Sequence, residues 1–284
     1  MGNDTACKID WDSARHEINK NGFTIVPKLF SSLFIERFTQ TIKSILLLRC
    51  ESLGLKIAEC EDIDNLYSKL SEKNDEAIRE VILLLRDSPI FYEAITSPKI
   101  LEATQQLLKT DLVQVVHDVC LFRIDPPNDR RRSFEWHQDY PFNVLSQSAL
   151  TVWMPLTKIT EEMGPLRVVK GSHKKIRKMF LKHSNMQSSK GMGHTVFELA
   201  EPSIDEMEHQ SFSLPSMNPG DVLFLNSCLL HRSGINNSLK SRWVCNLRYG
   251  DMRDEKLILR NFKVARDKSP YVFNEIHPDL VISK

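Results

Sequence analysis

After residue 111, four short segments rich in β-branched and aromatic residues follow one another, a pattern that is typical of β-strands. They are LVQVVHDVCLFRI at 112–124, SALTVWMPLT at 148–157, DVLFLNSCLLH at 221–231 and RWVCNLRYG at 242–250. Turn signals rich in glycine, proline and asparagine separate them, and no helical pattern alternates with them. Short strands without intervening helices predict an antiparallel sandwich or barrel rather than a parallel sheet.

The first hundred residues have a helical pattern instead. We expect helices from Asp12 or Ser13 to Asn19, from Ser31-Ser32 onward, from Asp75 to Leu85, and after Pro98.

This order of elements predicts a single domain over residues 1–284. Residues 1–110 form a helical support, 111–250 a mainly β core and 251–284 a C-terminal extension. The expected fold class is mainly β with flanking helices: a double-stranded β-helix, or jelly roll, with a helical N-terminal buttress.

The composition excludes several classes of protein. Apolar residues make up 41% and charged residues 26%, which fits a packed core and not a disordered chain. A net charge of +1 argues against nucleic acid as the main partner. No apolar run of about 18 residues predicts a membrane span, and the polar start predicts no signal peptide. The six cysteines form no C-x-x-C pair, which fits reduced thiols in a cytoplasmic protein.

The most informative motif is WHQDYPF at 136–142. On a strand, residues i and i+2 point to the same face, so His137 and Asp139 would project into one space. With a histidine from a distant segment they would form the 2-His-1-carboxylate triad of non-haem Fe(II) oxygenases, which leaves metal positions open. The triplet alone is weak, because His277-Pro278-Asp279 has the same spacing.

Support for the metal site comes from two segments further along the chain. His231 ends one strand-like run, and Arg242 begins the next after a turn-rich loop, so we expect the two runs to form an antiparallel hairpin. Alternation would place Val244, Asn246 and Arg248 on the face of Arg242. An anion would offset the cost of burying such a polar face, and arginine can bind a carboxylate through two hydrogen bonds.

These motifs carry a resemblance to a known family. WHQDYPF, TVWMPLT, EEMGPLRVVKGSHK and HRSGINNSLKSRW resemble the corresponding motifs of the phytanoyl-CoA dioxygenase family of Fe(II)/2-oxoglutarate oxygenases, and NGFTIVPKLFSSLFIERF resembles the family's opening segment. The resemblance covers most of the chain.

The resemblance implies roles for individual residues. His137, Asp139 and His231 match the iron ligands, and Arg242 matches the arginine that binds the distal carboxylate of 2-oxoglutarate. Further positions match residues around the co-substrate: Ser233, Trp153 and Gln138, together with Gly164 in a family turn. Met163 and Lys170 depart from the usual Asn and Pro, and no upstream co-substrate lysine can be placed. Asp139 is retained, which disfavours the halogenating relatives.

The expected activity is therefore an Fe(II)- and 2-oxoglutarate-dependent dioxygenase that uses O2 to hydroxylate an unactivated C–H bond, releasing succinate and CO2. Its expected partner is a small-molecule substrate, which basic clusters at 130–132 and 170–178 would suit if it is anionic or carrier-linked. Two alternatives stay open: desaturation, ring formation or epimerisation, and a catalytically silent jelly-roll ligand-binding protein. The segment 180–216 is expected to be an irregular lid loop.

Overall fold

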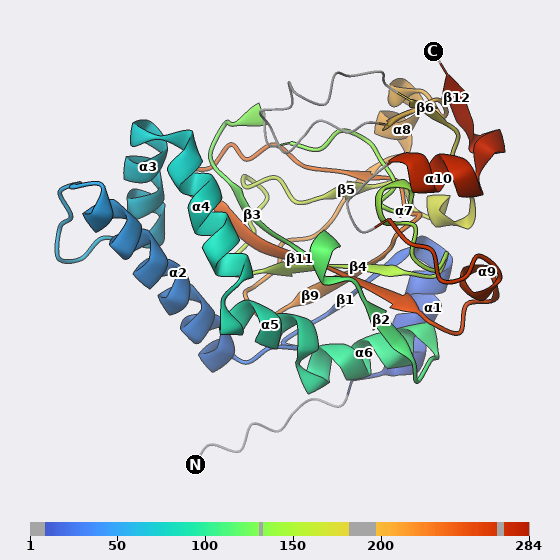
Figure 1. Ribbon diagram of the computed structural model, residues 1–284, viewed down its shortest axis with the longest axis horizontal. Helices are drawn as coiled ribbons and strands as arrows, with labels where there is room; N and C mark the ends of the chain where they lie inside the picture. The colour runs from blue at the N-terminus through green and yellow to red at the C-terminus, as the bar shows by residue number, and fades with distance from the viewer. Residues whose placement is uncertain (1–8, 131–132, 182–196, 266–269, 284) are drawn as a thin grey trace.

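The structure is a computed structural model that describes residues 9–130, 133–181, 197–265 and 270–283 (Figure 1). Helices dominate the chain before residue 110. They are α1 (Trp11–Asn21), α2 (Ser32–Ser52), α3 (Ile63–Lys73), α4 (Asp75–Arg86), α5 (Pro89–Thr96) and α6 (Pro98–Leu108). The side chains of Asp10 and Ser31 cap α1 and α2 by accepting hydrogen bonds from N–H groups of the first turn. The four predicted helices are confirmed to within a few residues, whereas α3 and α5 were not predicted.

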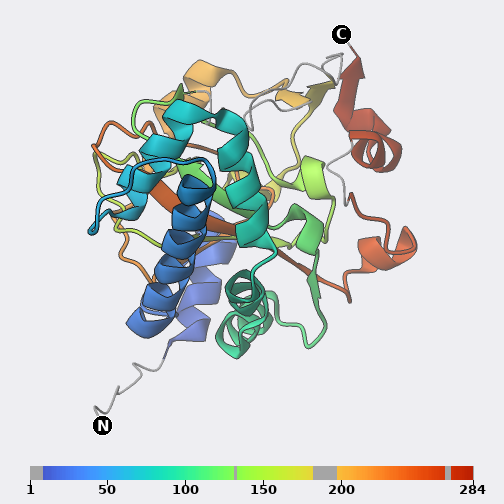
Figure 2. The same cartoon turned by 60° about the vertical axis from the view of Figure 1, so that its left-hand side comes forward.

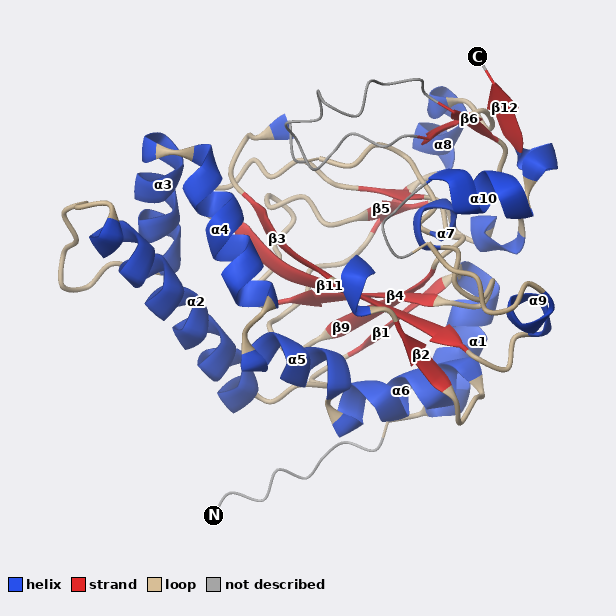
Figure 3. Ribbon diagram, viewed as in Figure 1, coloured by secondary structure: helices blue, strands red, loops and turns tan. Residues whose placement is uncertain are grey.

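The largest sheet has six antiparallel strands in the order β1-β9-β4-β11-β2, with β3 also paired to β11 (Figure 3). Its strands are β1 (Phe23–Val26), β2 (Val113–Val115), β3 (Leu121–Asp125), β4 (Leu150–Pro155), β9 (Val222–Asn226) and β11 (Arg242–Asp251). The long strand β11 is central, because it pairs with β4 on one side and with β3 and then β2 on the other.

Two small sheets complete the described strands. One has the order β10-β5-β8, and the other has the order β12-β6-β7. Their strands are β5 (Arg167–Val168), β6 (Met179–Leu181), β7 (Phe197–Leu199), β8 (Phe212–Ser213), β10 (His231–Arg232) and β12 (Val281–Ser283). The pairing of β12 with β6 is parallel, so the prediction of antiparallel strands holds for the core but not for this edge.

The two faces of the large sheet differ as the alternation along β11 predicts. Trp243, Cys245, Leu247 and Tyr249 belong to one apolar cluster with the buried faces of the N-terminal helices. Of these helices, α2, α3 and α4 lie on the opposite side of the molecule from the C-terminal segment (Figure 2). On the other face, Val244 packs in a second apolar cluster that includes residues of the β5 sheet. The polar face of β11 is therefore enclosed between two sheets.

The predicted hairpin of the His231 and Arg242 segments is wrong. The strand-like run ends at Asn226, and His231 follows a turn as part of β10, which pairs with β5. Arg242 starts β11 in the large sheet. The side-chain amide of Asn236 holds the connecting loop by donating to the carbonyls of Asp125 and Lys240 at 3.0 and 2.8 Å. The chain thus crosses from one sheet to the other instead of turning back on itself.

The prediction of an irregular loop over 180–216 is also wrong for its described part. Residues 197–213 contain β7, helix α8 (Ile204–Gln210) and β8, and α8 begins with a capping box formed by Ser203 and Glu206. Residues 182–196 lie outside the described residues, so the lid role predicted for them is not addressed. No helix in the described part of the chain is long and apolar enough to cross a membrane.

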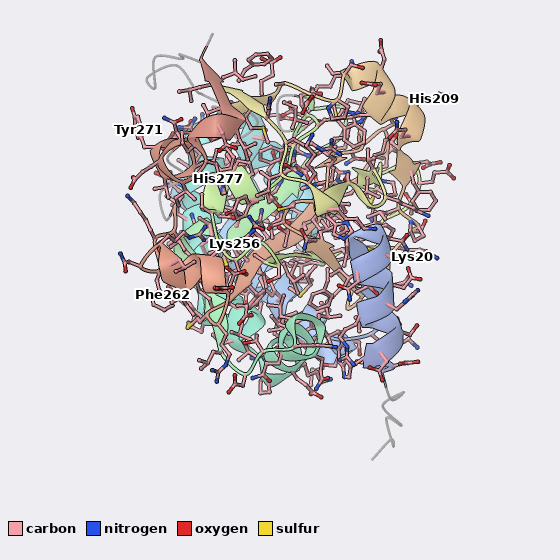
Figure 4. All side chains as sticks on the ribbon, turned by 90° about the vertical axis from the view of Figure 1, so that its right-hand side faces the viewer. Lys20, His209, Lys256, Phe262, Tyr271 and His277 are labelled. Atoms are coloured by element: carbon pink, nitrogen blue, oxygen red, sulfur yellow. The ribbon has the colours of Figure 1, made fainter. Side chains whose placement is uncertain are left out.

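The C-terminal residues pack against the short helix α7 (Tyr140–Asn143). They form α9 (Glu255–Leu259), α10 (Pro270–Ile276) and the 3-10 helix η4 (Pro278–Leu280). The Tyr140 hydroxyl accepts from Arg260 at 3.0 Å and lies 3.1 Å from Nε2 of His277, whose position beside α10 is visible in Figure 4. The second His-x-Asp triplet, which begins at His277, thus belongs to this packing and not to a described cluster of metal ligands.

Candidate metal centre

Two histidines are brought together by backbone pairing between distant segments. The N–H of His137 donates to the carbonyl of His231 at 3.0 Å, and the N–H of His231 donates to the carbonyl of His137 at 3.0 Å. Residues directly opposite each other in such a pair have neighbouring side chains. The ring centroids of the two histidines are accordingly 4.2 Å apart.

Asp139 reaches the histidines by a different route from the predicted one. Only His137 makes a strand-like bridge, and Asp139 has helical backbone angles of φ −75° and ψ −28° at the start of α7. Pro141 favours this because its ring suits the first turn of a helix. The prediction of a regular strand over 136–142 is therefore wrong, although the predicted convergence of His137 and Asp139 is confirmed.

The three side chains could hold one metal ion. Their candidate ligand atoms all lie within 4.8 Å of one another. Nε2 of His137 is 3.8 Å from one carboxylate oxygen of Asp139, and Nε2 of His231 is 3.8 Å from the other. This donor set of two imidazoles and one carboxylate suits Fe(II) and leaves positions free for further ligands.

Backbone carbonyls fix which ring nitrogen of each histidine is free. Nδ1 of His137 lies 2.6 Å from the carbonyl of Glu135, and Nδ1 of His231 lies 2.9 Å from the carbonyl of Leu229. A carbonyl can only accept, so each Nδ1 carries the proton and donates. Each Nε2 then keeps a free lone pair and lies 3.8 Å from an oxygen of Asp139, and a histidine whose Nδ1 is held in this way is usual around protein metals.

The carboxylate of Asp139 is held at both oxygens. Thr151 on β4 donates to Oδ2 at 2.5 Å, and Nη2 of Arg248 on β11 donates to Oδ1 at 3.2 Å. Burial favours the neutral acid, but Arg248 and the two histidines outweigh it and hold the pKa of Asp139 below its ordinary value. Asp139 is therefore ionised at neutral pH, as a metal ligand must be.

Burial also sets the charge of His137. Desolvation of the imidazolium, with a contribution from His231, lowers the pKa of His137 to about 3. The ring is therefore neutral at pH 7 and does not need to lose a proton before it binds a metal.

We expect the metal-free protein to lose stability as the pH falls from about 6.5 to about 3. The unfolded chain protonates His137 in this range, whereas the folded protein does not until a pH of about 3. The unfolded state then binds more protons, so the free energy of unfolding falls on acidification by on the order of a few kcal/mol. At pH values below about 4, Asp139 acts in the same direction because its folded pKa is depressed. Urea titrations across this range measure the effect, and a free energy that stays constant would contradict it.

Arg242 is buried at the start of β11 with part of its donor set unused. Nη1 donates to the carbonyls of Met163, at 3.0 Å, and Gly164, and Nη2 donates to Asp125 at 3.3 Å. Nε is buried and has no partner among the described residues. Arginine has five N–H donors, and these bonds use three. Nε and one N–H of Nη2 therefore remain as donors that could bind a carboxylate.

Gly164 supports this arrangement through its backbone. It has a φ of +65°, and an added Cβ would collide with the backbone of Gly234 and Ile235. Only glycine fits this close approach without strain. The turn thus presents the Gly164 carbonyl to Arg242 and joins the two loops that flank the site.

The structure gives the other three predicted co-substrate residues, Ser233, Trp153 and Gln138, different surroundings. Ser233 is buried, and its hydroxyl accepts from the N–H of Phe134 at 3.1 Å. Trp153 is buried on β4 and lies opposite Asn246 of β11, on the enclosed face of the sheet. Gln138 binds backbone groups: its amide donates to the carbonyls of Lys175 and Cys228, and its carbonyl accepts from the N–H of Arg177. These contacts favour a structural role for Gln138, and they do not bring it to the triad.

Further functional candidates were not identified from the sequence. Asp125 accepts from both Arg123, at 2.7 Å, and Arg242, so that one carboxylate bridges two buried guanidinium groups. Thr151 and Arg248 hold Asp139. Alternation along β11 does place Arg248 on the polar face, but the register that brings it opposite Thr151 is a tertiary feature without a local signal.

Solved structures of non-haem iron enzymes resemble this structure. The epimerase SnoN, in complex with Fe3+, alpha ketoglutarate and nogalamycin RO, gives a TM-score of 0.57 at 15% identity over 85% of this chain and 83% of SnoN. EctD from S. alaskensis with 2-oxoglutarate and 5-hydroxyectoine gives 0.57 at 17% identity over 89% of this chain and 79% of EctD. At such identities the likeness shows the fold, which is that of the 2-oxoglutarate-dependent non-haem iron oxygenases. The strands described here form open sheets and not a closed barrel.

Sequence comparison places the chain more narrowly within that class. The family model of phytanoyl-CoA dioxygenase (PhyH) matches residues 18–244. A probable phytanoyl-CoA dioxygenase of Caenorhabditis elegans is 25% identical over 253 residues, which are 84% of this chain and 74% of that relative. The chain belongs to the phytanoyl-CoA dioxygenase family. It is thus an enzyme of the 2-oxoglutarate-dependent non-haem iron type, with Fe(II) and 2-oxoglutarate as its cofactors.

Proposed function

We propose that the protein is a dioxygenase that hydroxylates an unactivated C–H bond of a small molecule, with His137, Asp139 and His231 as the ligands of Fe(II). The observation that carries the proposal is the convergence of two imidazole Nε2 atoms, each fixed by a backbone carbonyl, on one ionised carboxylate. Bound Fe(II) and 2-oxoglutarate supply the oxidising power, since decarboxylation of the co-substrate to succinate and CO2 activates O2 for attack on a C–H bond.

The co-substrate's distal carboxylate binds Arg242 in this proposal. The unpartnered Nε is the specific support, because a buried donor without a partner costs free energy that an incoming carboxylate would recover. Ser233, which follows directly after β10, and Trp153, on β4, would line the same space, since Ser233 lies two residues after His231 and Trp153 lies on the enclosed face. In this proposal the chain orients 2-oxoglutarate by both of its ends, one at the metal centre and the distal carboxylate at Arg242. The buried surroundings exclude water, which strengthens the interaction at each end.

The domain organisation is part of the proposal. The large sheet and the β10-β5-β8 sheet would be the two halves of a jelly-roll core. Residues 111–250 would supply all of their strands except β1, which the mainly helical buttress of residues 1–110 contributes, and residues 251–284 would be an extension. Among the described residues, Cys50, Cys60, Cys120, Cys228 and Cys245 are free thiols, which supports placement in the reducing cytoplasm.

The substrate is proposed to be a small molecule, because the similar enzymes SnoN and EctD were solved with small molecules. An anionic or carrier-linked substrate would suit the basic residues at 170–178. Epimerisation and ring closure remain the second candidate outcome, because SnoN is an epimerase and the similar protein SnoK is a carbocyclase.

Turnover of 2-oxoglutarate tests the function. We expect succinate formation that requires both Fe(II) and O2 and that increases when a substrate is added from a panel of small molecules. Mass spectrometry of the substrate then separates the outcomes: a gain of one oxygen atom marks hydroxylation, a loss of two hydrogens marks ring closure or desaturation, and an unchanged mass with altered stereochemistry marks epimerisation. Succinate formation at the same rate without iron would contradict the proposal.

A further inference from the structure

The carboxylate of Asp139 has a different protein partner at each oxygen. Oδ2 accepts from the Thr151 hydroxyl at 2.5 Å, and Oδ1 accepts from Nη2 of Arg248 at 3.2 Å. Oδ1 also faces Nε2 of His137 and Oδ2 faces Nε2 of His231, both at 3.8 Å. The plane of the carboxylate is therefore fixed before any metal binds.

The two partners come from a rigid part of the fold. Thr151 on β4 and Arg248 on β11 are directly opposite each other in the register of the two strands. Their exposures are 2% and 7%. Arg248 is paired with β4, and on the other side of β11 the pairing with β3 reaches Asn246 and the pairing with β2 begins at Tyr249. Arg248 is also fixed by a hydrogen bond from Nη1 to the Leu247 carbonyl at 3.2 Å. Side chains on paired strands hold a geometry better than side chains on loops.

We propose that Arg248, assisted by Thr151, is a positioning residue that keeps Asp139 bound to the metal through one oxygen only. A carboxylate that is free to rotate can bind through both oxygens and would then occupy one of the positions that the co-substrate and O2 need. The charged hydrogen bond from Arg248 engages one oxygen and opposes that rotation. This inference rests on the proposed function, because it assumes that the triad holds the metal.

Two effects of Arg248 on metal affinity oppose each other. The guanidinium repels a metal cation, so its removal alone would tighten binding. It also orients the ligand, and loss of such outer contacts generally weakens metal affinity by about 10- to 100-fold. We expect orientation to dominate, because the charge of Arg248 is partly cancelled by the Asp139 carboxylate, whose oxygen lies 3.2 Å from Nη2.

Titration of metal-free protein with Co(II) alone tests the proposal, because the d–d absorption of Co(II) reports coordination number. We expect Arg248→Met to raise the dissociation constant for Co(II) by about 10- to 100-fold and to change the spectrum towards that of a higher coordination number. Arg248→Lys should bind Co(II) more tightly than Arg248→Met but less tightly than the wild type. Thr151→Val should also raise the dissociation constant, by less than Arg248→Met does. Arg253→Met is the matched control: it removes an arginine just beyond β11 that pairs with Asp111 at the surface, so binding should stay at the wild-type value.

The outcomes separate this inference from the proposed function. Thermal melts of the metal-free variants check folding, and Arg248→Lys and Thr151→Val carry the test if Arg248→Met does not fold. Wild-type affinity and an unchanged spectrum in the Arg248 and Thr151 variants, or tighter binding, would overturn the positioning role alone. Equal Co(II) binding by wild type and His137→Ala would instead remove the metal site on which the proposed function depends.

Discussion

Replacing His137 by alanine should abolish iron binding at the centre and iron-dependent succinate formation. The substitution removes one of the two Nε2 ligands and leaves His231 and Asp139, which cannot complete a facial triad. Iron content after anaerobic reconstitution and desalting, together with succinate release, measures both effects. We expect both to fall to the level of protein that was never given iron.

His209→Ala is the matched control for this loss. His209 lies on the exposed surface of α8 (Figure 4), so its removal should change neither iron content nor turnover. Far-UV circular dichroism of both variants verifies that the fold is retained. Full turnover by folded His137→Ala protein would show that the iron ligands have been assigned wrongly.

Replacing Arg242 by alanine should raise the KM for 2-oxoglutarate by at least about 30-fold. Truncation of one partner of a buried, hydrogen-bonded charge pair costs about 2–5 kcal/mol, and each 1.4 kcal/mol is about tenfold in affinity. Iron binding should persist, because Arg242 contacts Asp125 and the carbonyls of Met163 and Gly164 and not the triad. Initial rates of succinate formation over a range of 2-oxoglutarate concentrations provide the measurement.

Arg242→Lys refines the same experiment. Lysine retains the charge but lacks the planar pair of donors, so its KM should fall between those of the wild type and the alanine variant. An unchanged KM in the alanine variant, with iron content intact, would remove Arg242 from the co-substrate site. The neighbouring Arg123, which also pairs with Asp125, would then be the next candidate.

The sequence was sufficient to predict which three side chains meet at the candidate metal centre, but not the way in which the centre is built. Spacing and the family motif identified His137, Asp139 and His231, and the structure brings all three together. A strand over 136–142 was the expected cause, yet Asp139 is helical at the start of α7. The cause lies in long-range pairing of His137 with His231, which no local pattern encodes.

The relation between His231 and Arg242 illustrates the same limit. A turn-rich loop between two strand-like runs usually predicts a hairpin, whereas these strands belong to different sheets. The difference lies in long-range contacts: β10 pairs with β5, and the amide of Asn236 in the loop donates to the Asp125 carbonyl on a strand far away in the sequence. Alternation along β11 is a local property, and it correctly separated Trp243 and Leu247, which pack against the helices, from the polar face of Arg242.

Helix prediction succeeded for α2 and α6 and missed α3. Ser31 caps α2 with the expected hydrogen bond, and α6 begins at Pro98 as predicted. Helix α3 also carries local signals, because the side chain of Asp62 accepts from the N–H of Asn65 and one side buries Leu66 and Leu70. Helices α1, α3 and α6 each have 11 residues and would be marginal in isolation, so packing against the core stabilises all three.

The most direct test of the whole account is the visible absorption of the purified protein under anaerobic conditions, with Fe(II) and 2-oxoglutarate added in turn. We expect a weak metal-to-ligand charge-transfer band that requires both additions and is absent from His137→Ala. No band from the folded wild-type protein, or an equal band from His137→Ala, would contradict chelation of 2-oxoglutarate by a metal at His137, Asp139 and His231. Of these two results, the missing band in the wild-type protein would also favour a catalytically silent ligand-binding protein.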